Sequence, residues 1–195
     1  LGEQSANQYR DMNLSVDSGG IEVARTQERM DELQRRMTSA TAWGIEAHLL
    51  TPAEVKELVP FINDEVILGG FYCPTVSVVD SLETGTTMRK EAIETAGLQV
   101  FANTEVLEML TEEDPVPGMT RITGVVTDKG TIEAEYVVIA CGVWSNRIAN
   151  MAGATIPLVP AVHQMADVGP MDVLAETQSE ISYPIVRDMD TFCYE

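Results

Sequence analysis

A glycine turn at the end of an apolar run is the first feature of this sequence that could do chemistry. Residues 136–140, YVVIA, are continuously apolar, which is typical of a parallel strand covered on both faces. The run leads into Cys141-Gly142, and a helix-like segment begins at Trp144. A residue without a side chain at the carboxyl end of such a strand lets backbone N–H groups approach a cofactor. The pattern indicates a ligand-binding turn, although an ordinary strand-to-helix turn is the commoner alternative.

Of the two histidines, one is a further candidate for chemistry. His163 lies in the mostly apolar segment 156–168, and His48 lies in a short apolar strand, where we assign it no role. An imidazole can accept or release a proton near neutral pH, so His163 could take part in acid–base catalysis. An isolated histidine is more often structural, and the residues around His163 leave both interpretations open.

The cysteines argue against two kinds of site. Cys73, Cys141 and Cys193 are odd in number and widely spaced, so neither a disulfide framework nor a CxxC metal site is indicated. We expect each to be a small buried apolar residue, in a protein of the reducing cytoplasm.

Composition and charge exclude further classes. The 195 residues are 45% hydrophobic, enough for the core of one large or two small domains. A net charge of -19 with 12 Lys and Arg argues against nucleic-acid binding. The sequence shows no apolar run of the ~18 residues that a membrane helix takes and no signal-peptide pattern, so we expect a soluble protein. Because the chain opens without Met and closes on a strand-like run, we expect a piece of a larger protein.

Helix caps and turn residues predict the elements that position these residues. Helices are expected at residues 5–12, 27–43, 52–59 and 81–96. Strands are expected at residues 21–24, 45–50, 66–73, 99–102, 105–110, 121–127, 131–134, 136–140 and 183–187. Asp128-Lys129-Gly130 is a hairpin signal. Strand 66–73, helix 81–96 and strand 99–102 predict a crossover unit of a parallel sheet. The Met and Trp side chains on the helix at 27–43 are expected in the core.

Several segments, in their order, resemble one family. They are TPAEVKELVP, GGFYCP, FANTEVLEM, RITGVVTDKGTIEAEYVVIACGVWSNRIANMAG, IPLVPAVHQ and IVRDMDTFCYE. The set covers nearly the whole chain and resembles the dimethylglycine oxidase, dimethylglycine dehydrogenase and sarcosine dehydrogenase group of D-amino-acid-oxidase-like flavoproteins. The resemblance implies an internal fragment. The Gly-x-Gly-x-x-Gly turn for FAD and the flavin-tethering histidine would lie upstream, and the segment closing over the flavin, with any folate-binding domain, would lie downstream.

The resemblance also implies which residues hold FAD. Val106 matches a valine whose backbone contacts the adenine, a role that does not need the side chain. Cys141, Gly142 and Trp144 match the family's Ala-Gly-x-Trp turn close to the FAD, with Cys141 in the alanine position. A plain core valine and a packing tryptophan are the alternatives for Val106 and Trp144.

Two further residues are implied to be catalytic. His163 matches the histidine placed over the flavin where the substrate amine binds, and Tyr194 matches a tyrosine of the substrate cavity. The implied reaction is oxidative demethylation of dimethylglycine or sarcosine by hydride transfer to FAD. A non-catalytic binding or scaffold domain of the same fold is one alternative. A related flavoprotein acting on another amino acid or on glycerol phosphate is another.

The implied architecture is a mixed α/β fold with two interleaved parts. A substrate-binding, antiparallel-rich sheet would draw on residues 20–50 and 156–195, and a partial Rossmann-like FAD-binding layer on residues 66–153. The corresponding domain division is 1–65, 66–155 and 156–195, truncated at both ends. The partners implied are a small methylated amine and the rest of the same enzyme, and we expect exposed sheet edges to favour oligomerisation of the isolated fragment.

Overall fold

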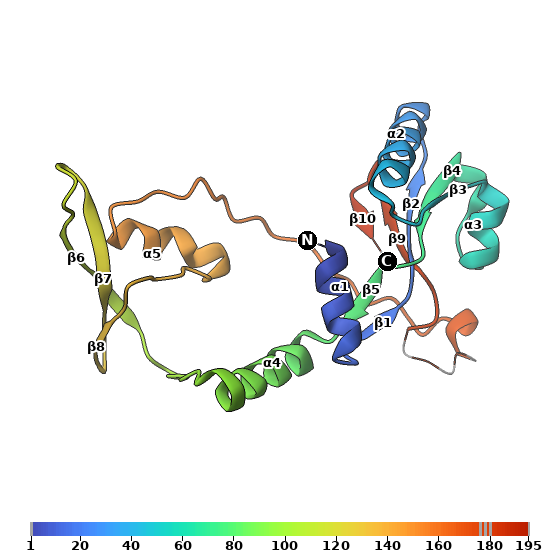
Figure 1. The fold of residues 1–195 in the computed structure, drawn as a ribbon. Helices are drawn as coiled ribbons and strands as arrows, with labels where there is room; N and C mark the ends of the chain where they lie inside the picture. The colour runs from blue at the N-terminus through green and yellow to red at the C-terminus, as the bar shows by residue number, and fades with distance from the viewer. Residues whose placement is uncertain (1, 176, 178, 180, 195) are drawn as a thin grey trace. The chain divides into compact units, whose positions relative to one another are not determined.

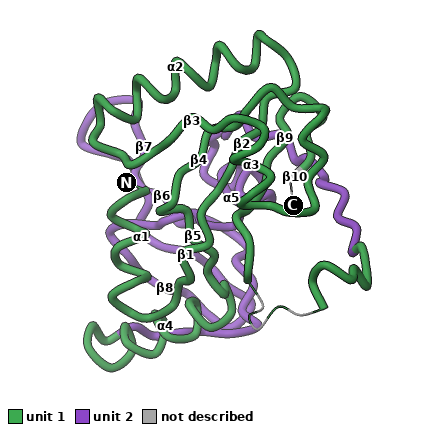
Figure 2. Tube along the Cα trace, turned by 90° about the vertical axis from the view of Figure 1, so that its right-hand side faces the viewer, with its two compact units in different colours: residues 1–97, 168–195 green, residues 98–167 purple. Residues whose placement is uncertain are grey.

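The chain divides into two compact units in a computed structural model, which describes residues 2–175, 177, 179 and 181–194. Unit 1 comprises residues 1–97 and 168–195, and unit 2 comprises residues 98–167 (Figure 2). The inserted position of unit 2 agrees with interleaving in the sequence. The predicted domain division at 1–65, 66–155 and 156–195 rests on the family resemblance and stays a prediction.

A five-stranded mixed sheet forms the centre of unit 1 (Figure 1). Its strand order is β10-β9-β2-β4-β3. The strands are β2 (Gly20–Ala24), β3 (His48–Leu50), β4 (Gly69–Cys73), β9 (Ile185–Asp188) and β10 (Cys193–Tyr194). All neighbours pair antiparallel except β2 and β9, which are parallel. The mixed α/β, antiparallel-rich fold class is therefore confirmed.

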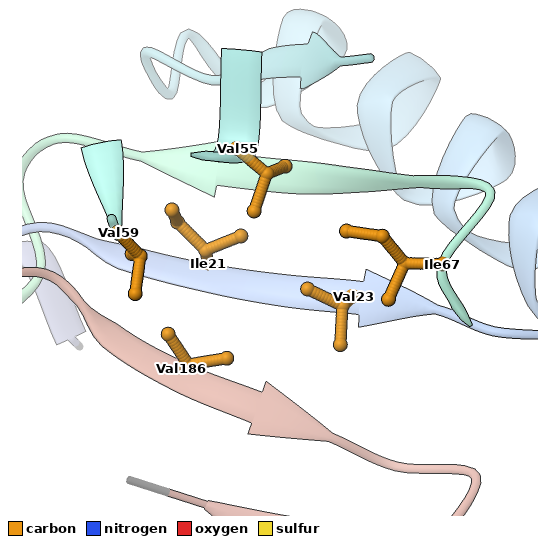
Figure 3. Close-up of a cluster of buried hydrophobic side chains, with 6 residues drawn as sticks. All are labelled: Ile21, Val23, Val55, Val59, Ile67 and Val186. Carbon is orange, nitrogen blue, oxygen red and sulfur yellow. The ribbon is translucent and has the colours of Figure 1, made fainter. Parts of the chain in front are cut away.

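Helices lie on both faces of this sheet. Ile21 and Val23 of β2 pack with Val55 and Val59 around α3 (Pro52–Leu58), in a cluster completed by Ile67 and Val186 (Figure 3). Glu22 points to the other face because side chains alternate along a strand. There it meets Arg36 of α2 (Gln27–Trp43). The core of unit 1 thus lies between the sheet and α3, and α2 covers part of the opposite face.

Local cap chemistry places the helices as predicted. The α2 helix spans Gln27–Trp43 and ends at Gly44, whose φ of 71° favours a glycine. Thr51 and Glu54 form the capping box that begins α3. Asp80 accepts hydrogen bonds from two backbone N–H groups at the start of α4 (Ser81–Ala96). Along α2, the side chains of Leu33 and Ala40 are buried. The prediction that Trp43 is core was wrong, since this last residue of the helix is exposed.

The remaining elements of unit 1 are the first helix, two short strands and two 3₁₀ turns. The α1 helix (Gly2–Asp11) confirms the helix predicted near the start. The three-residue strands β1 (Ser15–Asp17) and β5 (Ser77–Val79) pair antiparallel and were not predicted, because three residues are too few to show a period. Two 3₁₀ turns, η1 (Asp64–Val66) and η3 (Asp172–Leu174), complete the unit.

Unit 2 is built on a three-stranded antiparallel sheet. Its strands, in spatial order, are β6 (Val106–Glu113), β7 (Thr120–Thr127) and β8 (Gly130–Glu133). Thr127 pairs with Gly130 across the turn, so the predicted hairpin is confirmed. The 3₁₀ turn η2 (Gly142–Trp144) leads into α5 (Ser145–Met151), which packs against β6.

Two predicted strands do not form in this structure. Residues 99–102 and 136–140 are neither helix nor strand, and Tyr136 and Val138 are 86% and 85% exposed. A parallel strand needs neighbours to satisfy its N–H and C=O groups, and neither segment pairs with a strand among the described residues. The predicted crossover unit is therefore absent from the described residues. The strand predicted at 66–73 was also assigned to the wrong sheet, since β4 pairs with β2 and β3.

The three cysteines are less buried than predicted. Cys141 and Cys193 are exposed and Cys73 is half-buried, so the prediction that all three are buried was wrong. All three are free thiols in the described part of the chain. None of the helices that the structure describes has both the length and the apolar composition needed to cross a bilayer.

Candidate functional site

The turn after residues 136–140 contains a glycine in the left-handed region of backbone conformation. Gly142 has φ of 54°, a left-handed conformation that a side chain disfavours. A Cβ built on Gly142 would meet no atom within 4 Å, so open space lies above this peptide. The Trp144 N–H donates to the Cys141 carbonyl oxygen at 3.1 Å, and both side chains are exposed. The turn therefore presents backbone and an indole surface outward.

The strand that carries Val106 lies beside this turn's helix. Val106 is half-buried at the start of β6 and pairs with Thr127 of β7. The turn at residues 141–144 runs directly into α5, which packs on β6 and buries Ser145 and Ala149. Two of the predicted cofactor contacts, the valine and the glycine turn, thus belong to adjacent packed elements of unit 2.

The two predicted catalytic residues lie in different units. His163 is an exposed residue of unit 2, in the segment 154–171, which has neither helix nor strand. Tyr194 lies in β10 of unit 1, in register with Arg187 of β9, and its side chain is outside the described part of the structure. The predicted approach of His163 and Tyr194 over a flavin stays a prediction.

Unit 2 carries a groove that sequence reasoning did not find. Its volume is about 820 Å³, and its lining consists of residues 121–123 of β7 and residues 133–137, which run from β8 into the apolar segment. The exposed Tyr136 belongs to this lining. Neither Gly142 nor His163 lines the groove, so it does not include these two predicted contact residues.

A smaller cavity lies against the sheet of unit 1. It has a volume of about 170 Å³ and is bounded by charged and apolar side chains. Its lining residues are Gly20, Ile21, Glu22, Arg36, Phe71, Cys73, Val76, Ile185 and Arg187. The signal that could have found it is Glu22 itself, a charged residue between Ile21 and Val23 in an otherwise apolar strand.

Glu22 is a buried carboxylate with one oxygen unused. Its side chain is 10% exposed, and its Oε2 accepts a hydrogen bond from Arg36 Nη1 at 2.6 Å. Its Oε1 has no hydrogen-bond partner among the described residues. A buried acceptor left unpaired costs about 1–3 kcal/mol, so this oxygen is an unusual feature of a folded protein.

Arg36 and Arg29 join this carboxylate to a larger ion-pair network. Arg36 also donates to Glu32 at 2.6 Å, and this hydrogen bond lowers the pKa of Glu32. Burial works against the charge of Arg29, but its hydrogen bond to Asp190 at 3.3 Å and the carboxylates nearby prevail and raise its pKa. The network holds α2 to the loop after β9.

Comparison with known proteins decides the family of this chain. Residues 5–194 match the family described as FAD dependent oxidoreductase. This chain belongs to that FAD-dependent oxidoreductase family. It is similar to mitochondrial sarcosine dehydrogenase of Mus musculus, with 34% identity over 92% of the chain and 19% of the relative. It also resembles mitochondrial dimethylglycine dehydrogenase of Rattus norvegicus, with 28% identity over 90% of the chain and 20% of the relative.

A relative with a different name also matches. The mitochondrial pyruvate dehydrogenase phosphatase regulatory subunit of Mus musculus is 30% identical over 91% of the chain and 19% of the relative. The chain spans about one fifth of the length of these curated relatives. Among solved structures, L-proline dehydrogenase from P. horikoshii has the same fold, with a TM-score of 0.78 and 22% identity over 98% of this chain and 50% of that one.

Some of the residues that the resemblance assigns to FAD have a geometry that suits part of that cofactor. The left-handed Gly142 with open space above it, the exposed Trp144 and the half-buried Val106 on the adjacent strand suit a flat aromatic group and its linker. The 195 residues contain no Gly-x-Gly-x-x-Gly turn, so these residues alone do not supply the usual pyrophosphate-binding helix start. No cluster of three or more His, Cys, Asp or Glu suited to a metal occurs in the described residues.

Proposed function

We propose that the protein containing this chain oxidatively demethylates N-methylated glycines, with sarcosine and dimethylglycine as the first candidates. The observation that carries the proposal is the similarity to a sarcosine dehydrogenase over nine tenths of the chain, together with a similar match to a dimethylglycine dehydrogenase. FAD, when bound, accepts the hydride that leaves the methyl carbon. A folate-binding domain elsewhere in the protein, which would capture the one-carbon product, belongs to the same proposal.

The residues of this chain then have distinct roles. The backbone of Val106 and the turn at Cys141, Gly142 and Trp144 hold the cofactor in unit 2. His163 takes the proton of the substrate ammonium, because an amine gives up hydride only when its lone pair is free. Tyr194 orients the substrate through its hydroxyl.

The test uses the full-length protein and two histidine variants. We expect sarcosine or dimethylglycine to bleach the flavin absorbance under anaerobic conditions and to release formaldehyde. His163→Asn should slow flavin reduction about 10²–10⁴-fold, the usual effect of losing an acid–base group, and should remove one limb of its pH profile. His48→Asn changes the other histidine, an exposed residue of β3, and should leave the rate unchanged. Equal rates for both variants would remove His163 from the mechanism.

Two further expectations concern the activity of the isolated chain and the cellular location of the protein. We expect the 195-residue chain alone to be inactive, because it lacks a Gly-x-Gly-x-x-Gly turn to hold the pyrophosphate. Cytoplasmic location stays a prediction, and the three curated relatives above carry the word mitochondrial in their names. Cell fractionation with an antibody to the chain distinguishes the two compartments.

A second function is favoured by one observation, the 30% identity to a phosphatase regulatory subunit. In that case the domain would bind a partner protein and carry out no turnover. A full-length protein that purifies without flavin and takes up none from added FAD would support this second function over the first.

A further inference from the structure

The cavity beneath α2 in unit 1 has the chemistry of a binding site for a small zwitterion. Glu22 lies in its wall, nine-tenths buried, with Oε1 unpaired among the described residues. Arg187 of β9 lines the same cavity and lies in register with Glu22 across the parallel β2–β9 pair. A buried hydrogen-bond acceptor and an exposed guanidinium therefore lie on neighbouring strands, on one face of the sheet.

The size of the cavity limits what can enter. A volume of about 170 Å³ corresponds to about five or six waters at the density of the liquid. A molecule of about six non-hydrogen atoms, such as an N-methylated glycine, is of this size, whereas a nucleotide or a peptide is far larger. Phe71, Val76 and Ile185 supply apolar wall, which suits a methyl group.

The charged side chains of the cavity determine which charged groups a ligand would carry. Oε1 of Glu22 can accept a hydrogen bond from a substrate ammonium, and a guanidinium binds a carboxylate through paired hydrogen bonds. Arg36 neutralises the other oxygen of Glu22 and is held by Glu32, so the carboxylate is fixed in place before a ligand arrives. We propose that Glu22 and Arg187 form a recognition site for the zwitterionic form of a small amino acid, with the ammonium on Glu22 and the carboxylate on Arg187.

The position of the cavity in the sheet agrees with a role in substrate binding. Tyr194, Arg187, Glu22 and Phe71 occupy one cross-strand row through β10, β9, β2 and β4. The residue predicted to contact substrate is thus the register neighbour of Arg187. This inference rests on the proposed function for the identity of the ligand, an N-methylated glycine. It assigns recognition of the zwitterion, before His163 takes the ammonium proton, to residues that the resemblance did not name.

The test measures binding by calorimetry on the full-length protein, with sarcosine and methoxyacetate as probes. Methoxyacetate keeps the carboxylate and the size of sarcosine but lacks the ammonium. Glu22→Gln should weaken sarcosine about 10- to 100-fold and should not weaken methoxyacetate, because the variant loses a contact that only the ammonium makes. Arg187→Gln should weaken both probes about 10- to 100-fold. The matched controls Glu57→Gln and Arg35→Gln, at exposed positions of α3 and α2, should change neither.

Two results would overturn the inference. One is a sarcosine affinity within about twofold of wild type in both Glu22→Gln and Arg187→Gln, and the other is an equal loss of both probes in Glu22→Gln. Thermal unfolding checks that each variant is folded, and if Glu22→Gln is not, Arg187→Gln at its exposed position decides the question. Failure of the proposed function would appear elsewhere, in a wild-type flavin that neither sarcosine nor dimethylglycine reduces.

Discussion

Units 1 and 2 differ in how they bury apolar surface. In unit 1, strands far apart in the sequence pair in one sheet, and β2 and β9 bring Ile21 beside Val186 in a core closed by α3. In unit 2 a local three-stranded sheet buries Met109 and Ala149, while Tyr136 and Val138 remain exposed. Unit 1 therefore encloses its own core, and unit 2 leaves part of an apolar run exposed at a groove beside β7.

The largest expected effect comes from removing a side chain from the core of unit 1. Ile21→Ala should lower the free energy of unfolding by about 2–5 kcal/mol, because Ile21 is 1% exposed and its loss leaves a cavity. The matched change Ile132→Ala in β8 of unit 2, at a position 40% exposed, should cost less than about 1 kcal/mol. Guanidinium unfolding of the two variants measures the difference. Equal losses would mean that unit 2 closes a core comparable to that of unit 1.

The next effect concerns association of the isolated 195-residue chain. We expect it to self-associate through the exposed apolar run of unit 2, so that Val138→Lys shifts its mass in light scattering toward that of one chain. The control is Leu82→Lys, which changes a similarly exposed residue of α4 in unit 1 and should leave association unchanged. A wild-type chain that is monodisperse at the mass of one copy would contradict this prediction.

The same contrast explains which elements the sequence predicted. Helix ends depend on neighbouring residues, so Gly44 marked the end of α2, Thr51 the start of α3 and Asp80 the start of α4. The β7–β8 hairpin was equally local, since Asp128 and Lys129 form its loop. Elements whose signals lie within a few residues were therefore predicted to within about one residue of their bounds.

Strand partners could not be read in this way. Residues 66–73 have the composition of a strand, but nothing within them specifies pairing with β2 in place of a second sheet. Residues 136–140 have the apolar pattern of a covered strand, yet the structure leaves Tyr136 and Val138 exposed, because a strand also requires hydrogen-bonded neighbours. The Glu22 cavity escaped prediction for the same reason, since Arg187 reaches it from a segment far along the chain.

A smaller loss of stability is expected when the first residue before a helix is changed, and it should differ between the two units. Thr51→Ala should cost about 1 kcal/mol of stability, because the Thr51 side chain and Glu54 satisfy each other's backbone N–H groups at the start of α3. The backbone N–H and the hydroxyl of Thr51 both donate hydrogen bonds to the Glu54 carboxylate, and these bonds lower the pKa of Glu54. The corresponding residue of α5 in unit 2, Trp144, makes no side-chain cap, so Trp144→Ala should change helix stability little. Circular dichroism during thermal unfolding measures both variants.

The smallest effect depends on pH and on the ion pairs of unit 1. Burial raises the pKa of Asp190, but hydrogen bonds from the Arg25 backbone and the Arg29 guanidinium outweigh it and hold that pKa below its usual value. A carboxylate with a lowered folded pKa stabilises the fold above its unfolded pKa of about 3.9 and loses that contribution as pH falls through the folded value. Asp190→Asn should therefore cost less than about 1 kcal/mol at pH 7, and this cost should vanish in more acid solution.

The control for this last variant lies in unit 2. Asp167 is an exposed residue of the segment without helix or strand, so Asp167→Asn should leave stability unchanged at both pH values. Urea unfolding of wild type and both variants at pH 7 and near pH 3 gives the comparison. If the cost of Asp190→Asn were the same at the two pH values, the carboxylate charge would not be what holds the loop after β9 to α2. The hydrogen bonds of Asp190, which an amide can partly replace, would then be responsible instead.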